Sequence, residues 1–169
     1  DLSRVFLALL GSAAAGVSLF AAGYFRKGEG TAPGVLGLQY HLFLASMGFV
    51  LVADDAYAFM VAWETMALTS YFLVTAQHGI PEIRSAGFLY LLMAHVGAIA
   101  ILLSFGILQG GTWLFSFDAM RASTLSTPWA TAAFLLALFG FGAKAGLLPL
   151  HVWLPEAHPA APSPVSALM

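Results

Sequence analysis

The sequence of 169 residues contains no cysteine and little charge, and each shortage excludes a class of protein. Without cysteine the chain forms no disulfide, iron–sulfur cluster or thiolate metal site, so any redox chemistry must belong to a partner. Only 8% of the residues are charged, the net charge is -2 and no basic run is present, which excludes nucleic acid as a partner. We therefore expect no electron-transfer centre and no cofactor in this chain.

Hydrophobic residues make up 60% of the sequence, far more than in a soluble domain. Because roughly 20 apolar residues cross a bilayer, the pattern predicts an all-α integral membrane protein. Asp54 and Asp55 form a short acidic corner, so the second and third spans must be antiparallel neighbours, and the polar stretch 116–128 is expected to hold a short amphipathic helix. Five spans are predicted, at about 5–25, 36–53, 56–76, 88–108 and from 129 onward.

The ends of the chain and its basic residues give two further expectations. The sequence starts at Asp1 and stops in the apolar run "PVSALM", which predicts a piece of a longer protein. We expect an N-terminal helix and loop at 1–35 and an incomplete transport region at 36–169. By the positive-inside rule, the side that carries Arg26, Lys27 and Arg84 is predicted to be cytoplasmic, opposite Arg4 and Arg121.

Glu64, in "AWETMALTSYF", is the first ionisable residue predicted to lie deep in the membrane. It falls eight residues into the third predicted span, which is about 12 Å along a helix. A charge at that depth is costly, so it indicates a functional site. The alternative is a packing role, with the carboxyl group protonated or bonded to a hydroxyl of Thr65, Thr69 or Ser70.

Lys144 lies in the fifth predicted span, just before two prolines in "AKAGLLPLHVWLPEAH". Pro149 and Pro155 cannot donate backbone hydrogen bonds, so carbonyl groups are freed at membrane depth and the helix is predicted to break. A half-helix that ends near Lys144 would direct the negative end of its dipole at the ammonium. The pattern favours a buried, titratable cation, and the alternative is a lysine that snorkels to the membrane surface.

Two histidines are candidate proton relays, because the imidazole ring titrates near neutral pH. His95 lies in the fourth span, in "MAHVGAIAI", and His151 lies at the predicted break. Either could instead be an ordinary hydrogen-bonding residue of the helix bundle. The histidines show no close repeat, so the sequence predicts no metal site.

At these residues the sequence resembles a known family. "AWETMALTSYFL" and "FGFGAKAGLLPLHVWLPEAHPAAPSPVSALM" resemble the antiporter-like membrane subunits of respiratory complex I, Mrp sodium/proton antiporters and membrane-bound hydrogenases, above all those of formate hydrogenlyase and hydrogenase-4-type complexes. The resemblance implies a fold with two inverted repeats, of which this chain holds most of the first. It also implies that Glu64 and Lys144 are the pair central to proton movement, with Pro149, His151 and Pro155 in the motif at the break.

Three functions remain open on the sequence. The leading hypothesis is a proton-translocating subunit of a redox-driven hydrogenase or NADH:quinone oxidoreductase complex in a prokaryotic cytoplasmic membrane. Its expected partners are the lipid bilayer, other membrane subunits, a peripheral hydrogenase or dehydrogenase arm, and protons or Na⁺. The second hypothesis is a subunit of a multisubunit Na⁺/H⁺ antiporter, and the third is a structural anchor for a peripheral enzyme.

Overall fold

The fold is a bundle of long helices, seen in a computed structural model that describes residues 2–27 and 30–169. Across these residues the regular structure is helical apart from one isolated β-bridge between Asp55 and Ser116. This confirms the predicted all-α class. The elements are α1 (Leu2–Tyr24), η1 (Phe25–Lys27), α2 (Pro33–Val52), α3 (Ala56–Val74), α4 (Pro81–Leu108), α5 (Phe117–Ala122), α6 (Thr127–Ala145), η2 (Leu150–Trp153), α7 (Leu154–Ala160) and α8 (Ser163–Ser166).

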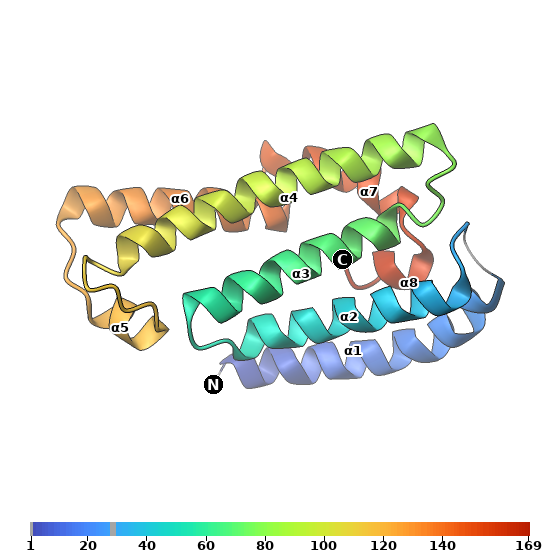
Figure 1. The fold of residues 1–169 in the computed structure, drawn as a ribbon, viewed down its shortest axis with the longest axis horizontal. Helices are drawn as coiled ribbons and strands as arrows, with labels where there is room; N and C mark the ends of the chain where they lie inside the picture. Colours follow the sequence, from blue (N-terminus) through green and yellow to red (C-terminus); the bar gives the residue numbers. More distant parts are fainter. Residues whose placement is uncertain (1, 28–29) are drawn as a thin grey trace.

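Five segments are long and apolar enough to cross a membrane, as the sequence predicted. They are α1, α2, α3, α4 and the interrupted stretch Thr127–Ala160. Successive long helices run in alternating directions along the long axis of the molecule (Figure 1). Arg26 and Arg84 therefore lie at one end of the bundle, and Arg4 and Arg121 lie at the other.

Proline sets the start of several helices, because its missing N–H costs nothing in the first turn. Helices α2, α4 and α6 each carry a proline at the first or second position. The boundary predicted for the fourth span was too late, since α4 begins at Pro81 rather than near Phe88. Its first turns include Glu82 and Arg84, and these charged residues extend the helix beyond the apolar run that guided the prediction.

The acidic corner, Asp54 and Asp55, joins α2 to α3 as predicted, and its backbone also hydrogen-bonds to α5. The Asp55 side chain accepts a hydrogen bond from the Ala58 N–H at 2.9 Å and caps α3. The Phe117 N–H donates to the Asp54 carbonyl at 3.0 Å, and the Ala56 N–H donates to the Phe115 carbonyl at 2.9 Å. The predicted short helix α5 is thereby tied to the start of α3.

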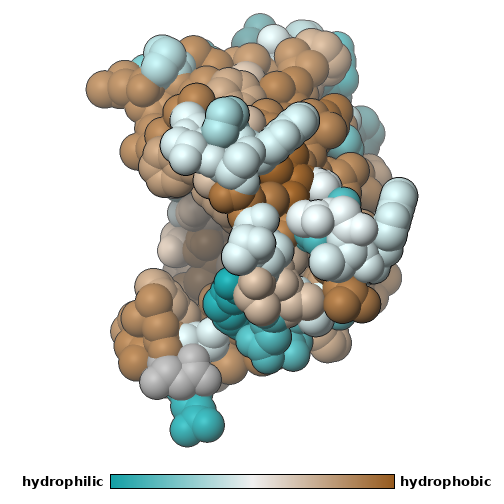
Figure 2. Space-filling view, turned by 90° about the vertical axis from the view of Figure 1, so that its left-hand side faces the viewer, coloured by the Kyte–Doolittle hydropathy of each residue, from teal (hydrophilic) through white to brown (hydrophobic). Residues whose placement is uncertain are grey.

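An aromatic cluster fills the bundle at the same end. Phe59 and Trp63 of α3 stack with their ring centroids 5.4 Å apart. Phe105 of α4, Phe117 of α5 and Phe141 of α6 surround them with tilted or edge-on contacts. Figure 2 views this end and shows pale and teal side chains over the middle of the facing surface, with brown, hydrophobic side chains between and around them.

Candidate functional site

The predicted helix break is present, and a glycine forms it. Helix α6 ends at Ala145, and Gly146 follows with a left-handed backbone (φ 72°) that glycine adopts without strain. The Leu147 N–H then donates to the Gly142 carbonyl at 2.9 Å. The chain resumes as η2 and α7, so the break falls between Lys144 and Pro155, as the sequence predicted.

A tryptophan side chain satisfies one carbonyl at the break. The Trp153 indole N–H donates to the Ala143 carbonyl at 2.8 Å, and Trp153 is buried. The carbonyl of His151, which the proline at 155 was expected to free, accepts instead from the Leu154 N–H. The backbone carbonyls of Ala143 and His151 thus find protein partners at the interruption, which is what the interior of a membrane requires.

Lys144 lies in the last turn of α6 and points at α4. Its Nζ donates a hydrogen bond to the Tyr90 hydroxyl at 2.8 Å and lies 5.1 Å from the centre of the Tyr90 ring. The lysine therefore contacts protein, and it does not snorkel. Its position also matches the helix dipole, because the carbonyl end of α6 favours a positive charge.

The hydroxyl that receives Lys144 continues into a chain of hydrogen bonds. Tyr90 is 1% exposed, and its hydroxyl lies 2.5 Å from the hydroxyl of Ser70 on α3. Ser70, which is fully buried, donates in turn to the Met66 carbonyl at 2.6 Å. Lys144 is linked through two hydroxyl groups to the backbone of α3.

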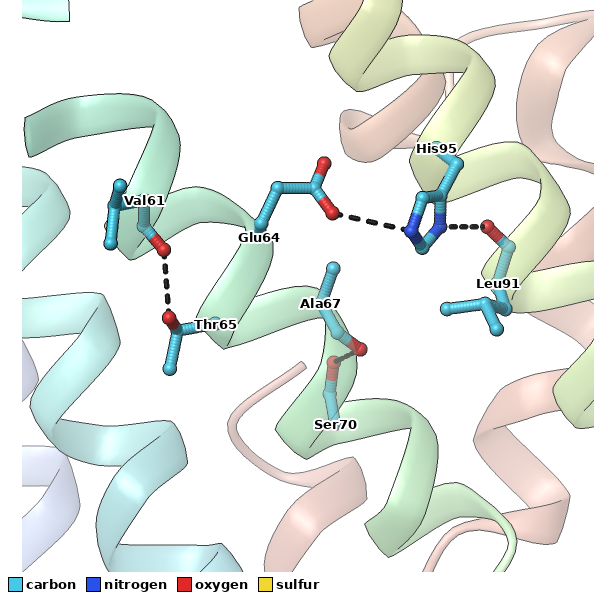
Figure 3. A network of polar contacts seen from close by, with 7 residues as sticks. All are labelled: Val61, Glu64, Thr65, Ala67, Ser70, Leu91 and His95. Carbon is cyan, nitrogen blue, oxygen red and sulfur yellow. Dashed lines mark hydrogen bonds and ion pairs between the residues drawn. The ribbon is translucent and has the colours of Figure 1, made fainter. Parts of the chain in front are cut away.

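Glu64 contacts a different partner, His95 of α4 (Figure 3). Glu64 Oε2 lies 3.3 Å from His95 Nε2, and His95 Nδ1 lies 2.9 Å from the Leu91 carbonyl. Because a carbonyl can only accept, Nδ1 carries a hydrogen, and Nε2 is the nitrogen that gains or loses a proton. At this distance the Glu64 carboxyl group and the His95 ring can share one proton.

The hydroxyl groups considered as packing partners of Glu64 are occupied elsewhere. The hydroxyl groups of Thr65, Thr69 and Ser70 donate to carbonyls of their own helix, at Val61, Thr65 and Met66. Figure 3 shows Glu64 turned away from Thr65 and Ser70 and toward His95 of α4. The structure therefore gives Glu64 a titratable partner.

The Glu64–His95 contact and the Lys144–Tyr90–Ser70 chain lie at two different heights along α3 and α4, and we call them the two layers of the site. Tyr90 and His95 are five residues apart, and Glu64 and Ser70 are six, so the layers are about 7.5–9 Å apart along the helices. Within residues 2–27 and 30–169, no ion pair joins Glu64 to Lys144.

The Glu64–His95 pair is only half-buried by the described residues. The side chains are 33% and 45% exposed, respectively, at a depth where lipid would solvate them poorly. Protein or water must therefore cover this face in the membrane.

Two further histidines, His151 and His158, lie at the helix break and just after it. His151 lies in η2, and its buried Nδ1 has no hydrogen-bond partner among the residues that the structure describes. His158 Nδ1 lies 3.0 Å from the Ser166 hydroxyl, and its ring stacks on Trp153 with centroids 6.4 Å apart. In the described part of the chain, no cluster of three or more His, Asp or Glu side chains could hold a metal ion.

Sequence reasoning missed Tyr90 as a site residue, and it considered Ser70 only as a partner of Glu64. A tyrosine in a membrane span is an ordinary core residue, so its type gave no signal. The only available hint was the need for a partner for Lys144, and Tyr90 lies 54 positions away in the sequence.

The geometry agrees with comparisons to known proteins. Residues 53–169 match the model of the NADH:quinone oxidoreductase/Mrp antiporter transmembrane family. The chain belongs to this family. The matched region holds the two layers, with Glu64, His95, Tyr90 and Lys144, and the helix break.

Similar proteins are membrane components of the predicted kinds. The chain is 46% identical to hydrogenase-4 component B of Escherichia coli over 90% of its length and 22% of that protein's. It is 29% identical to formate hydrogenlyase subunit 3 of the same organism, over 99% of this chain and 26% of that protein. A chain of the archaeal membrane-bound sulfane sulfur reductase superposes with a TM-score of 0.61 at 31% identity, over 75% of this chain and 21% of that one. The chain thus spans about a quarter of each relative's length, and the predicted resemblance is confirmed.

Proposed function

We propose that this chain is part of a proton-translocating membrane subunit of a hydrogenase or NADH:quinone oxidoreductase-type complex. The observation that carries the proposal is the direct contact of two titratable side chains, Glu64 and His95, on helices that span the membrane. The family match and the relatives support a place among other membrane subunits, with a peripheral redox arm and a prokaryotic cytoplasmic membrane as the setting.

In this proposal a proton moves between the two layers of side chains, which lie between α3 and α4 and to which α6 contributes Lys144. The Glu64–His95 pair holds a proton that can rest on either oxygen or nitrogen. Lys144 holds the next site at the helix break, and water connects the layers. A charge is costly in the bilayer, and charges a short distance apart interact. A proton bound in one layer therefore changes how readily the other layer takes up or releases a proton. His151, at the break, would pass the proton onward from Lys144.

The test uses the full complex in vesicles, with proton movement and redox turnover measured together. Glu64→Gln and Lys144→Met keep the size of each side chain but remove its titratable group, and each should lower proton translocation roughly tenfold or more. His95→Gln should lower it similarly, and combining it with Glu64→Gln should add little, because both residues serve one contact.

Asp118→Asn is the matched control, because Asp118 forms an exposed pair with Arg121 on α5 at 3.0 Å. Its translocation should stay normal, since exposed pairs of this kind contribute little. Normal pumping by assembled Glu64→Gln and Lys144→Met complexes would instead favour an anchoring role for the chain.

An Mrp-type Na⁺/H⁺ antiporter subunit is the second candidate, because the family includes such proteins. The same residues would then exchange protons for Na⁺ without redox turnover. An imposed Na⁺ gradient distinguishes the two, since proton flux that follows this gradient in the absence of electron donor supports the antiporter.

A further inference from the structure

The hydrogen-bonding partner of Lys144 is a tyrosine hydroxyl. Among the described residues no carboxylate lies within ion-pair distance of this ammonium, and the Tyr90 hydroxyl accepts its hydrogen bond at 2.8 Å. A carboxylate holds the charged form of lysine and has no proton of its own to offer when ionised. A hydroxyl group can both accept and donate. The chemistry of the partner therefore differs from that of a salt bridge.

The charged state of Lys144 fixes the direction of the whole hydrogen-bond chain. An ammonium has only donors, so Tyr90 must accept from it and direct its own hydrogen at Ser70, 2.5 Å away. Ser70 then donates to the Met66 carbonyl at 2.6 Å. The Tyr90 hydroxyl thus accepts one hydrogen bond and donates one, and the Ser70 hydroxyl does the same.

Loss of the proton lets this chain reverse. A neutral amine carries a lone pair, so the Tyr90 hydroxyl can turn and donate to it, and the Ser70 hydroxyl can turn and donate to Tyr90 in the same short contact. One of the other two N–H protons of Lys144 is the one that leaves. Tyr90 and Ser70 stay neutral, and only their O–H bonds rotate.

The surroundings of Tyr90 hold its ring in place, so that a change in its hydrogen bonds needs only a rotation of the O–H bond. Tyr90 is 1% exposed, and Trp153 packs edge-on against its ring with centroids 5.2 Å apart. Trp153 is in turn fixed to the break by its bond to the Ala143 carbonyl. Trp153 thus holds the Tyr90 ring beside Lys144 and also hydrogen-bonds the free carbonyl at the helix break.

We propose that Tyr90 is the positioning residue for Lys144, with a hydroxyl that accepts from the ammonium and donates to the neutral amine. Lys144 can then lose and regain its proton without leaving its place, because it keeps a hydrogen bond to Tyr90 in both states. This inference rests on the proposed proton-translocating function, and it adds a residue that neither charge nor family resemblance indicated.

The experiment compares Tyr90→Phe with Tyr40→Phe in the full complex in vesicles. Tyr40 is a close match, because it is also 1% exposed and its hydroxyl lies 3.2 Å from the Ser18 hydroxyl. Each substitution removes one buried hydroxyl, and among the described side chains it is the Tyr90 hydroxyl that accepts from a lysine. Tyr90→Phe should slow proton translocation about 10- to 100-fold, as expected for loss of a hydrogen bond to a charged group, and Tyr40→Phe should leave it unchanged.

A spectroscopic measurement separates this role from a purely structural one. With ring-labelled tyrosine, the infrared C–O band of a tyrosine should change during turnover of the unsubstituted complex, because its hydroxyl changes from acceptor to donor. The change should be absent in Lys144→Met. This comparison does not need the Tyr90 variant, so it decides the matter even if Tyr90→Phe fails to assemble.

The outcomes distinguish the inference from the function on which it rests. Normal pumping in Lys144→Met would overturn the proposed function itself. Loss of pumping in Lys144→Met, together with equal and normal rates in Tyr90→Phe and Tyr40→Phe, would overturn the role of Tyr90 alone. A tyrosine band that does not depend on Lys144 would overturn it as well.

Discussion

Substitution of Gly140 by alanine should separate α4 from α6 and destabilise the bundle. A Cβ added at Gly140 would lie 2.6 Å from the Gly97 carbonyl oxygen and 2.6 Å from a side-chain carbon of Ile101. Ordinary contact begins near 3.4 Å, so the two helices must move apart by about 0.8 Å. Neither obstacle is the free end of a flexible side chain, so the backbone has to give.

The free energy follows from two opposing effects. Overpacking of this kind costs about 1–3 kcal/mol, and replacing a helical glycine by alanine returns about 0.5–1 kcal/mol. The net loss of unfolding free energy should be about 0–2.5 kcal/mol. The shift also reaches the site, because Lys144 lies one turn after Gly140. Its 2.8 Å bond to Tyr90 would lengthen to about 3.6 Å, beyond a normal hydrogen bond.

A titration with a denaturing detergent, followed by tryptophan fluorescence, measures this loss. Gly97→Ala should cost less, because the nearest atom to its Cβ is 3.1 Å away, and Gly106→Ala should cost nothing, because no atom lies within 4 Å. Stability should therefore fall in the order Gly106→Ala, Gly97→Ala, Gly140→Ala. Equal stability of the three variants would refute the reasoning about close packing.

Two other substitutions, each compared with a control, test the hydrogen bonds that stabilise the helix break and the acidic corner. Trp153→Phe should keep the ring packing but leave the buried Ala143 carbonyl unpaired, at a cost of about 1–3 kcal/mol in the same titration. Trp129→Phe, at a residue that is 60% exposed, should be neutral, and an equal loss in both would argue against the capping bond. Asp55→Ala should remove the cap on α3 and cost about 0.5–2 kcal/mol. Asp54→Ala should cost less, since Asp54 holds α5 through its backbone carbonyl, and the reverse order would contradict this assignment.

Local sequence determined the spans and the break. Long apolar runs set the number of membrane helices, and Pro149 with Pro155 indicated that the last one is interrupted. These features depend on residues that are close together in the chain, and each has a direct physical cause in hydration or in the missing N–H of proline. The sequence also singled out Glu64, Lys144 and His95 because ionisable groups are costly in a membrane.

Tertiary structure decided the partners. The spanning helices are apolar on nearly every side, so no hydrophobic face told in advance how α3, α4 and α6 are rotated. Rotation of these helices brought His95 to Glu64, and Tyr90 and Ser70 to Lys144, over sequence separations of up to 54 residues. Small residues permit helices to approach closely, but only the tertiary structure shows that Gly97 of α4 meets Gly140 of α6, and this backbone contact sets how those two helices face each other.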